Sequence, residues 1–520
     1  MCKKRVVYQP SDVKKMIDRF NFPEDIVTNI EKENLLPAGV LSRLQSNFPK
    51  YSGFNETGRF LFTGKEHFSG LNGFKEIVDT LHKNGIDIGY LEERELFIKV
   101  YRFLATKHVL NTINWNDFAK DSLFQLVFPQ PDMIKSEIVE LYKNAETDEE
   151  RAKVVAGHLK KTNPHDGKQL LNKPWFENED GQLEILEGCQ HKYPQCMLLF
   201  DKTTQSCFSF CTYCFRHAQV RGDEDMFIQK DIKQVQEYIA RHKEITDVLM
   251  TGGDAGQMSY ERLEQYVLPF IENPKLMHIR TLRLGTRALS FAPEMVLKSD
   301  YDKTLKLLKK LIDNGVQVVW MAHISTPREL LNISTIAAVR RLRAAGIIIK
   351  SQSPIMNHIS MFTDENGEVD IDRSAQNWID LGNVMAMLSI GFHSMYCARP
   401  TGEHHYFTVP LTAINKIFSK VYRSLASINR PSRYITMTSS GGKISLLGEV
   451  EVNGETAFAL KFNEGRNMKW MDKVFLAKYD EQENTIANLP PFDTEKHFYE
   501  DDLKKTEQEL QEALEKRLKK

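Results

Sequence analysis

Three cysteines stand close together near the middle of the chain, at Cys207, Cys211 and Cys214, with the spacing C-x₃-C-x₂-C. Cysteine thiolates hold iron–sulfur clusters, so three of them at this spacing can bind three irons of a [4Fe–4S] cluster. The motif supplies no fourth cysteine, whereas electron-transfer ferredoxins close that corner with one. An open fourth iron indicates chemistry on a small molecule bound at the cluster.

Two other interpretations of the motif stay open. The cysteines could belong to a zinc site with His217 as fourth ligand, although structural zinc favours cysteines in paired spacings. The other four cysteines, Cys2, Cys189, Cys196 and Cys397, form no second C-x₂-C pair. The three could also be packed core residues, because free cysteine is often buried.

The composition is that of an ordinary soluble globular protein, with 41% hydrophobic and 27% charged residues in a chain of 520. Basic residues number 69 and acidic residues 70, so the net charge gives no argument for nucleic acid or an anionic membrane surface. Neither a signal peptide nor an apolar span long enough to cross a bilayer is visible. Seven cysteines, three of them clustered, do not suggest a disulfide framework. We therefore expect a cytoplasmic protein without nucleic-acid or membrane partners.

Strand-like and helix-like segments alternate around the cysteine motif, in a region that we expect to span residues 186–430. Strands are expected at 196–200, 247–250, 279–284, 316–321, 347–350 and 392–397, and helices at 259–271, 305–314, 327–345 and 378–388. This alternation predicts an α/β fold with a partial or full parallel (β/α) barrel. Polar motifs follow the strands, and the reactive groups of such barrels lie at the carboxyl ends of the strands.

The N-terminal region, residues 1–185, is expected to be mostly helical and to carry no catalytic constellation. The apolar spacing predicts helices at 100–106 and 138–142, and either a strand or a buried helix at 123–128. Thr147 and Glu150 have the spacing of a capping box that opens a further helix. The polar stretches 163–174 and 178–181 predict a linker.

The C-terminal region, residues 431–520, is expected to hold a loop, a β-hairpin and a charged helical tail. The loop ends in Gly441-Gly442-Lys443, and the hairpin would turn at Asn453-Gly454. The tail from residue 497 onward is dense in Glu and Lys, so we expect a solvated or surface-packed helix.

With these pieces in place, residues 188–465 resemble the lysine 2,3-aminomutase family of radical S-adenosylmethionine (SAM) enzymes. The motifs that carry the resemblance follow the family's order and spacing: HKYP at 191–194, CFSFCTYCFR at 207–216, LMTGGDA at 249–255, RLGTR at 283–287, AHISTP at 322–327, SQS at 351–353 and SSGGK at 439–443. The resemblance implies a barrel of the radical SAM type and an isomerase activity. It says little about the N-terminal region and the tail.

The resemblance also implies which residues bind the cluster and SAM. Cys207, Cys211 and Cys214 would ligate a [4Fe–4S] cluster whose open iron takes the amino and carboxylate groups of SAM. The SAM amino group would be held by a glycine pair that lets the backbone come close and by a carboxylate, namely Gly252, Gly253 and Asp254. Family members also bind SAM at the positions of Arg287, His323 and Gln352. Taken alone, each of these would more often be an interior polar residue whose hydrogen bonds are satisfied within the protein.

Pyridoxal 5′-phosphate (PLP) is the third cofactor that the resemblance implies. Lys443 stands at the position of the family's Schiff-base lysine, which must be a primary amine able to leave the cofactor when substrate arrives. Lys192 stands at the position where the family has an arginine that contacts the PLP phosphate. A lysine offers a point charge there in place of the bidentate contact of an arginine. Arg216 matches the arginine that binds the substrate carboxylate.

The activity implied is a radical 1,2-amino migration that converts an α-amino acid into a β-amino acid. An external electron donor reduces the cluster, SAM is cleaved to a 5′-deoxyadenosyl radical, and that radical takes hydrogen from Cβ of an amino acid held on PLP. The cofactors carry this chemistry, while the protein positions them and excludes water. The resemblance further implies a small-molecule substrate and a homo-oligomer.

The sequence departs from the family in two places. Lysine-specific members hold the distal ammonium of the substrate with two aspartates, and these positions are Ala398 and Thr436 here. Because a buried ammonium without a counter-charge is strongly disfavoured, we expect a substrate other than lysine unless Glu403 or another shifted carboxylate substitutes. The family's C-terminal zinc-binding cysteines are also absent, since no cysteine follows Cys397.

Two alternatives to a PLP-dependent 2,3-aminomutase stay open. The first is a radical SAM enzyme of another reaction type in which Lys443 does not bind PLP. The second is a non-catalytic protein that binds an iron–sulfur cluster or SAM and keeps the barrel.

Overall fold

The computed structural model describes residues 5–51, 60–163, 172–178, 180–222 and 226–518. Its centre is a run of parallel strands, each hydrogen-bonded to the next in chain order: β6 (Cys196–Phe200), β7 (Asp247–Thr251), β8 (Thr281–Thr286), β9 (Gln317–His323), β10 (Ile348–Ile355), β11 (Gly391–Cys397) and β12 (Ile435–Thr438). All six strands expected for the barrel are present. The predicted parallel α/β architecture is therefore confirmed.

Antiparallel strands extend this sheet at both ends. The strand β5 (Cys189–Tyr193) pairs with β6, and the strands β13 (Gly442–Val452), β14 (Glu455–Gly465) and β15 (Val474–Lys478) follow β12. The resulting eleven-stranded order begins at β15 and ends at β5, and these two edges do not pair with each other in the part of the chain that the structure describes. The barrel is thus partial, and one continuous sheet crosses from the barrel into the C-terminal region.

Side chains bring the β5 edge close to the C-terminal hairpin. The Lys192 ammonium on β5 donates a hydrogen bond to the Ser439 carbonyl, which lies between β12 and β13. The Lys443 ammonium at the start of β13 lies 5.2 Å from the centre of the Tyr193 ring. The sheet therefore curls so that residues from its antiparallel ends face one another.

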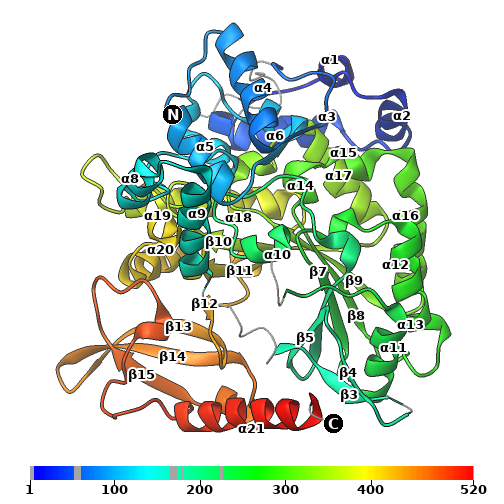
Figure 1. Ribbon diagram of the computed structural model, residues 1–520. Coiled ribbons are helices and arrows are strands. Elements are labelled where there is room, and N and C mark those ends of the chain that lie inside the picture. The colour runs from blue at the N-terminus through cyan, green and yellow to red at the C-terminus, as the bar shows by residue number, and fades with distance from the viewer. Residues whose placement is uncertain (1–4, 52–59, 164–171, 179, 223–225, 519–520) are drawn as a thin grey trace.

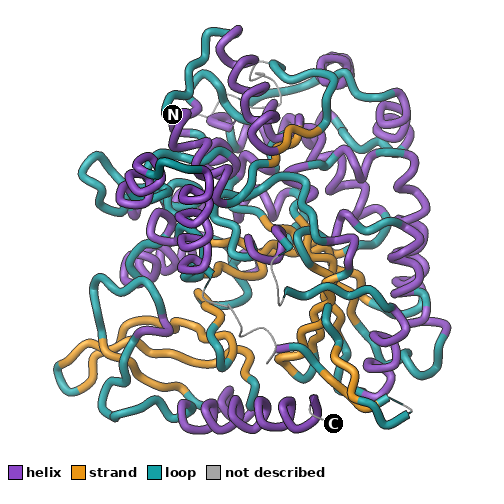
Figure 2. The backbone as a smooth tube through the Cα atoms, in the orientation of Figure 1, coloured by secondary structure: helices purple, strands orange, loops and turns teal. Residues whose placement is uncertain are grey.

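Helices connect the parallel strands and cover the outer face of the sheet (Figures 1 and 2): α11 (Ile232–Arg241), α12 (Tyr260–Val267), α13 (Pro269–Glu272), α14 (Ala288–Phe291), α15 (Glu294–Leu297), α16 (Asp302–Asp313), α17 (Ile333–Ala344), α18 (Ile371–Met387) and α20 (Leu411–Ser424). Their apolar faces are buried; α16, for example, buries Leu307, Leu308 and Leu311. Burial of each such side chain contributes about 1.5–3 kcal/mol. The short helices α10 (His217–Arg221) and α19 (His404–Phe407) follow strand ends.

The N-terminal region packs as a helical layer against the barrel (Figure 2): α1 (Pro10–Phe20), α2 (Glu24–Lys32), α3 (Ala38–Asn47), α4 (Gly70–Lys83), α5 (Leu91–Val100), α6 (Lys107–Thr112), α7 (Ser122–Val127), α8 (Ser136–Asn144) and α9 (Asp148–Thr162). The helix predicted at 138–142 lies within α8. Residues 123–128, for which a strand or a buried helix is predicted, lie almost entirely in the buried helix α7. The predicted capping box opens α9, with Thr147 and Glu150 bonding each other's backbone N–H groups at 3.2 Å.

The helix predicted at 100–106 is wrong. Helix α5 ends at Val100, and residues 104–106 form the strand β2 (Leu104–Thr106), which pairs antiparallel with β1 (His67–Ser69). The apolar spacing of this short segment fits either period, and tertiary pairing decides between them. Part of the predicted linker, residues 164–171 and 179, lies outside the described residues, while β3 (Trp175–Glu177) and β4 (Leu183–Ile185) form a small hairpin.

The C-terminal hairpin turns at Asn453-Gly454, as predicted. Both turn residues have positive φ, 53° and 83°, which a two-residue turn matched to the twist of the strands requires. The tail is the helix α21 (Glu500–Leu518), and it runs along the lower edge of the molecule beside the hairpin in Figure 1. Among the described residues, no helix is long and apolar enough to span a membrane.

Candidate active site

The three motif cysteines lie in the loop that follows β6, at the carboxyl edge of the parallel strands, and all three are half-buried. Burial raises the pKa of each thiol, and neighbouring motif sulfurs add to this rise at Cys207 and Cys214, where the pKa of Cys214 reaches about 12. Thiols that are close together and hard to ionise separately suit a metal cluster, because bound metal removes their protons. No three His, Cys, Asp or Glu side chains of the described residues converge on one metal ion. A four-iron cluster instead places each thiolate on its own iron.

The backbone of the cysteine loop is held by the N-terminal region. The Phe210 N–H donates to the Leu104 carbonyl at 2.7 Å, and the Thr106 N–H donates to the Ser209 hydroxyl at 3.1 Å. Thr212 donates its N–H to the Leu126 carbonyl at 2.9 Å. Strand β2 and helix α7 therefore fix the cysteine loop from outside the barrel, a role that the sequence did not reveal.

Arg287, which follows β8, makes the densest set of contacts at this edge. Its guanidinium donates to the Cys211 sulfur at 3.2 Å, to the Tyr213 hydroxyl at 2.8 Å and to the Glu329 carboxylate at 2.5 Å. Arg287 is 6% exposed and Glu329 is 1% exposed. Burial alone would lower the pKa of Arg287, but its anionic and hydrogen-bonding neighbours raise it well above the usual value. The structure thus places a fixed positive charge beside one motif sulfur.

His323, the last residue of β9, is the register partner of Gln352, which lies within β10. The His323 ring nitrogen Nε2 lies 3.2 Å from the Tyr213 hydroxyl, so this histidine reaches the cysteine loop. Burial, and then the charges of Arg287 and Arg216, hold the pKa of His323 well below its usual range. The imidazole is therefore neutral and can accept or donate a hydrogen bond to a ligand.

The Gly252-Gly253 pair packs directly against the chain just before the cysteine motif. A Cβ at Gly252 would lie 2.4 Å from the Thr204 hydroxyl, and one at Gly253 would lie 2.7 Å from the Ser206 carbonyl. Gly252 also has φ of +140°, a conformation that side chains rarely adopt. Glycine is therefore required here for the close approach of β7 to the cysteine loop.

The Asp254 carboxylate is 3% exposed and already binds protein groups. Its oxygens accept hydrogen bonds from the Gly256 and Arg287 N–H groups, both at 2.8 Å. Burial raises the pKa of Asp254 to about 6, although these bonds and one to Thr286 oppose that rise. Asp254 thus ties the end of β7 to the end of β8, and its expected contact with the SAM amino group stays a prediction.

Arg216 lies where β7 ends, two residues beyond the last motif cysteine. Its guanidinium donates to the Thr251 hydroxyl at 2.6 Å and to the Gly252 carbonyl at 3.3 Å, and it lies 5.0 Å from the centre of the Phe200 ring. Burial, and then the charge of Arg399, lower the pKa of Arg216 to about 10. Arg216 is therefore a cation at the strand edge whose contacts are with neutral groups.

Lys443 sits opposite Glu464 across the C-terminal hairpin. Its ammonium lies 2.5 Å from the Glu464 carboxylate, which also pairs with Arg433 at 3.0 Å. Burial raises the pKa of Glu464, but Lys443 and Arg433 outweigh it and bring it to about 2. The sequence analysis missed Glu464, although counting outward from the Asn453-Gly454 turn pairs positions 443 and 464.

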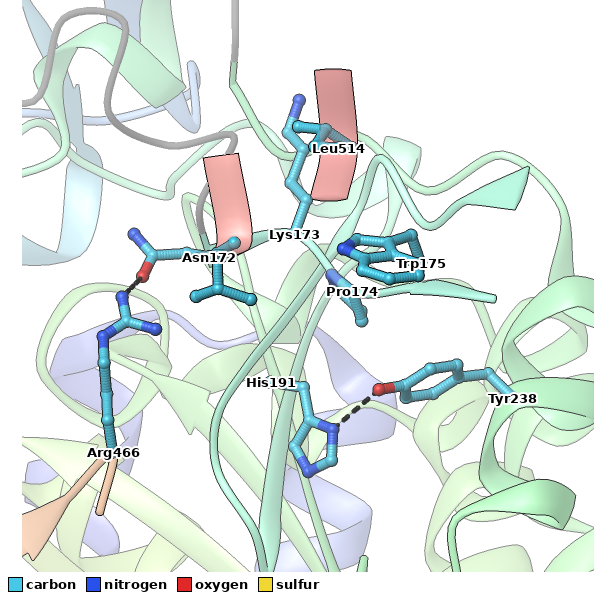
Figure 3. A pocket seen from close by; sticks show the side chains of 9 residues that line it. Asn172, Lys173, Pro174, Trp175, His191, Tyr238, Arg466 and Leu514 are labelled. Carbon is cyan, nitrogen blue, oxygen red and sulfur yellow. Dashed lines mark hydrogen bonds between the residues drawn. The ribbon is translucent and has the colours of Figure 1, made fainter. Parts of the chain in front are cut away.

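Lys192 and His191 of the HKYP motif point to opposite faces of β5, as successive strand residues do. His191 lines a cavity of about 220 Å³ and accepts or donates a hydrogen bond to the Tyr238 hydroxyl at 2.8 Å (Figure 3). Lys192 turns toward the C-terminal hairpin, and its pKa is held well below the usual value by burial and then by Arg466, Arg399 and Lys443. The side chains of Lys192, Lys443 and Tyr193 lie close together, because the pairing of β5 is irregular between Gln190 and Tyr193.

These three side chains fit a phosphate-bearing aromatic cofactor. A primary amine, Lys443, and a second cation, Lys192, flank the Tyr193 ring, with ammonium-to-ring distances of 5.2 and 5.9 Å. A ring surface suits a planar aromatic group, and the cations suit a phosphate. On the cluster side, three thiols around a fixed cation fit an iron–sulfur cluster.

The two positions that are acidic in lysine-specific enzymes are buried and uncharged here. Ala398 is 8% exposed, and Thr436 is fully buried in a neutral network with the Ser445 hydroxyl and the Asn463 amide. Glu403 is also buried, and its carboxylate binds the Tyr101 hydroxyl at 2.8 Å and the His158 ring at 2.5 Å. Glu403 is thus committed to the N-terminal helices rather than to a substitute ammonium site.

Comparison with known proteins adds relatives of one kind. A putative L-lysine 2,3-aminomutase of Aquifex aeolicus is 27% identical over 275 residues, which cover 53% of this chain and 67% of that one. The L-lysine 2,3-aminomutase of Clostridium subterminale is 28% identical over 191 residues, or 36% and 42% of the two chains. The glutamate 2,3-aminomutase of Clostridioides difficile is 31% identical over 175 residues, or 33% and 38%. The chain thus spans two thirds of the first relative and less than half of the other two.

Solved structures resemble the chain more weakly. A radical SAM methyltransferase from Sphaerobacter thermophilus has a TM-score of 0.30 at 15% identity, over 53% of this chain and 73% of that one. Streptococcus suis SuiB bound to S-adenosylmethionine has a TM-score of 0.32 at 12% identity, over 66% and 70%. No family model matches the chain. The fold assignment accordingly rests on the sheet itself.

Three cysteines at the carboxyl edge of a parallel sheet match the arrangement that the sequence predicts for a radical SAM protein. The chain is similar to curated lysine 2,3-aminomutases, and these relatives support its placement in that family.

Proposed function

We propose that this protein is a radical SAM, PLP-dependent amino acid 2,3-aminomutase. One observation carries the proposal. The two ends of one curled sheet contribute a cysteine loop suited to an iron–sulfur cluster, a neighbouring cation and the amine of Lys443. The cysteines, Arg216 and Arg287 come from loops at the barrel edge, while Lys443 comes from the hairpin that faces β5. Curated relatives that act on lysine or glutamate in the same way support the reaction type.

In this proposal the [4Fe–4S] cluster and SAM supply a carbon radical, and PLP supplies the group that stabilises the migrating nitrogen. The protein's part is to hold and orient these groups. Cys207, Cys211 and Cys214 would hold the cluster, with Arg287 beside Cys211. SAM would be surrounded by residues that follow β7, by the last residue of β9 and by one residue within β10: Gly252, Gly253, Asp254, His323 and Gln352.

Lys443 would hold PLP by its carbonyl carbon, and Lys192 would hold it by its phosphate. Arg216 would bind the substrate carboxylate. Glu464 keeps Lys443 in place at 2.5 Å and gives its ammonium a counter-charge until the cofactor replaces it. Exclusion of water follows from the burial of Arg287, Glu329 and Asp254 around the site.

The remaining expectations belong to the same proposal: an amino acid substrate, an external electron donor, a cytoplasmic location and a homo-oligomeric state. The functional divisions would be 1–185, 186–430 and 431–520. The hydrogen bonds from β2 and α7 to the cysteine loop support a positioning role for the first division.

Anaerobic reconstitution tests the proposal. We expect about four irons per chain, an imine absorbance after PLP is added, and SAM cleavage under strong reductant. Cluster assembly and SAM cleavage without PLP uptake would instead favour a radical SAM enzyme of another reaction type, a reading to which the Lys443–Glu464 ion pair lends some support. Absence of SAM cleavage by the cluster-loaded protein would favour a non-catalytic binding protein.

A further inference from the structure

Arg399 lies just beyond the end of β11, next to the first of the two positions that are acidic in lysine-specific enzymes. Its guanidinium lies 4.8 Å from the centre of the Phe215 ring, in the residue that follows the last motif cysteine. Arg399 is half-buried and lies near Tyr193 and Tyr396. Arg399 therefore points into the space between the cysteine loop and the β5 edge.

Arg399 has no counter-charge within the described residues. It takes part in no ion pair and no side-chain hydrogen bond there, and the same structure gives Arg216 only neutral hydrogen-bond partners. Two cations thus lie on the same Phe215 ring, at 5.2 Å for Arg216 and 4.8 Å for Arg399. Burying a charge without a partner is costly, so a pair of this kind is expected where anionic ligand groups bind.

Two acidic side chains near Lys443 are already engaged with other cations. Glu464 pairs with Lys443 and Arg433, and Asp247 pairs with Arg283 at 2.9 Å. Ala398, the residue before Arg399, is apolar. The site is thus built with a surplus of positive charge, which opposes a substrate with a cationic side chain.

We propose that Arg399 binds an acidic group on the substrate side chain, so that the substrate is an amino acid with a second carboxylate. Arg216 then takes the α-carboxylate and Arg399 the distal one. This inference rests on the function proposed above and adds the substrate class to it. Arg399 is a specificity-determining residue in this account, and its planar fork suits bidentate binding of a carboxylate.

The geometry limits the length of the substrate. Because both guanidinium groups lie about 5 Å from the centre of one ring, their carbon atoms are at most about 10 Å apart. One short dicarboxylic amino acid of the size of aspartate or glutamate can therefore contact both guanidinium groups when it approaches them from the same side.

Binding of an unreactive dicarboxylate tests the proposal independently of turnover. Glutarate, a five-carbon dicarboxylate, and butyrate, a four-carbon acid without the second carboxylate, are titrated calorimetrically into the cluster- and PLP-loaded protein. We expect glutarate to bind at least tenfold more tightly than butyrate in the wild type. Equal affinities for the two acids in the wild type would overturn the proposal without any variant.

Variants locate the effect. Arg399→Gln is expected to weaken glutarate binding at least tenfold while PLP absorbance and SAM cleavage stay unchanged, and Arg399→Lys is expected to retain part of the affinity. Arg373→Gln is the matched control, because Arg373 also lies over a phenylalanine ring, Phe362 at 4.2 Å, but is exposed on α18. Unchanged glutarate affinity in Arg399→Gln, or loss of PLP uptake instead, would contradict a role in substrate binding.

Turnover separates failure of this inference from failure of the proposed function. L-glutamate, L-aspartate, L-glutamine and L-lysine are each incubated with the loaded enzyme, and β-amino acid products are identified by mass spectrometry. Conversion of an acidic amino acid, with a raised KM in Arg399→Gln, is the expected result. Conversion of L-lysine or L-glutamine alone would overturn the inference and leave the aminomutase intact, whereas absent imine and SAM cleavage would overturn the function itself.

Discussion

The cluster side and the lysine side of the candidate site are built by different means. On the cluster side, the cysteine loop is fixed by backbone hydrogen bonds to β2 and α7, and Arg287 is locked by Cys211, Tyr213 and Glu329. On the lysine side, Lys443 is held by one ion pair across an antiparallel hairpin. The first arrangement is rigid and buried, and the second can be exchanged for a ligand.

This difference matches what each side would have to do. A cluster needs ligands that keep their positions through every turnover. A Schiff-base lysine must form and release a covalent bond, so a single counter-ion that it can leave is the more suitable support. Separate variants on each side should therefore have separable effects.

The largest expected effect comes from the cysteines. Cys211→Ala removes one cluster ligand, so we expect iron content to fall and SAM cleavage to drop below detection, while PLP uptake at Lys443 persists. Iron analysis and 5′-deoxyadenosine detection measure the first part, and visible absorbance measures the second. Cys397→Ala, outside the motif, should leave iron content unchanged. Joint loss of iron and PLP binding would show that the two sides are not separable.

Lys443→Ala makes the opposite test. We expect loss of the PLP imine absorbance and of amino migration, with cluster content and reductant-driven SAM cleavage retained. Within the part of the chain that the structure describes, Lys443 contacts no residue of the cluster side. Lys478→Ala, an exposed lysine on β15, is the control. Imine absorbance that survives in Lys443→Ala would place the PLP amine elsewhere.

Glu329→Gln tests the rigidity of the cluster side. It leaves the buried Arg287 charge without its carboxylate, and breaking a buried pair in this way costs about 3–5 kcal/mol. Urea unfolding of the metal-free protein should show this loss, whereas Glu261→Gln in the exposed pair with Lys303 should cost far less, because water screens that pair. Similar costs for the two variants would argue against a locked Arg287.

Glu464→Gln should have the smallest effect, and it should depend on pH. Lys443 and Arg433 hold the pKa of Glu464 at about 2, below its value in an unfolded chain, despite the opposing effect of burial. The pair therefore stabilises the fold above about pH 4.5 and loses this contribution as the pH falls toward 2. The difference in thermal midpoint between wild type and Glu464→Gln should shrink from pH 6 to pH 3.5. A constant difference would mean that Glu464 does not titrate with Lys443 as described.

The sequence predicted the two sides unequally well. Strands at 196–200 and 247–250 match β6 and β7 closely, because short buried runs bounded by polar motifs are a strong local signal. The strand β2 was mistaken for a helix, because its partner β1 lies far away in sequence and local spacing cannot show it. Its support of the cysteine loop was missed for the same reason.

The charged residues around Lys443 were harder to find. Glu464 could have been located by counting from the hairpin turn, since that register is set by local rules. Arg399 could not be located in this way. Its proposed role depends on its having no counter-charge among the described side chains, which come from elements distant in sequence. Sequence patterns locate ligands with fixed spacing, whereas an unpaired charge is visible only once the fold brings its surroundings together.

The central claim is that one chain uses a SAM-derived radical on an amino acid held at Lys443. Its most direct test is mass spectrometry of 5′-deoxyadenosine after reductant, SAM and PLP are added with amino acids deuterated at Cβ. We predict deuterium in 5′-deoxyadenosine from one of these substrates with the wild type and none with Lys443→Ala. Unlabelled 5′-deoxyadenosine from every amino acid offered to the fully loaded wild type would contradict the account.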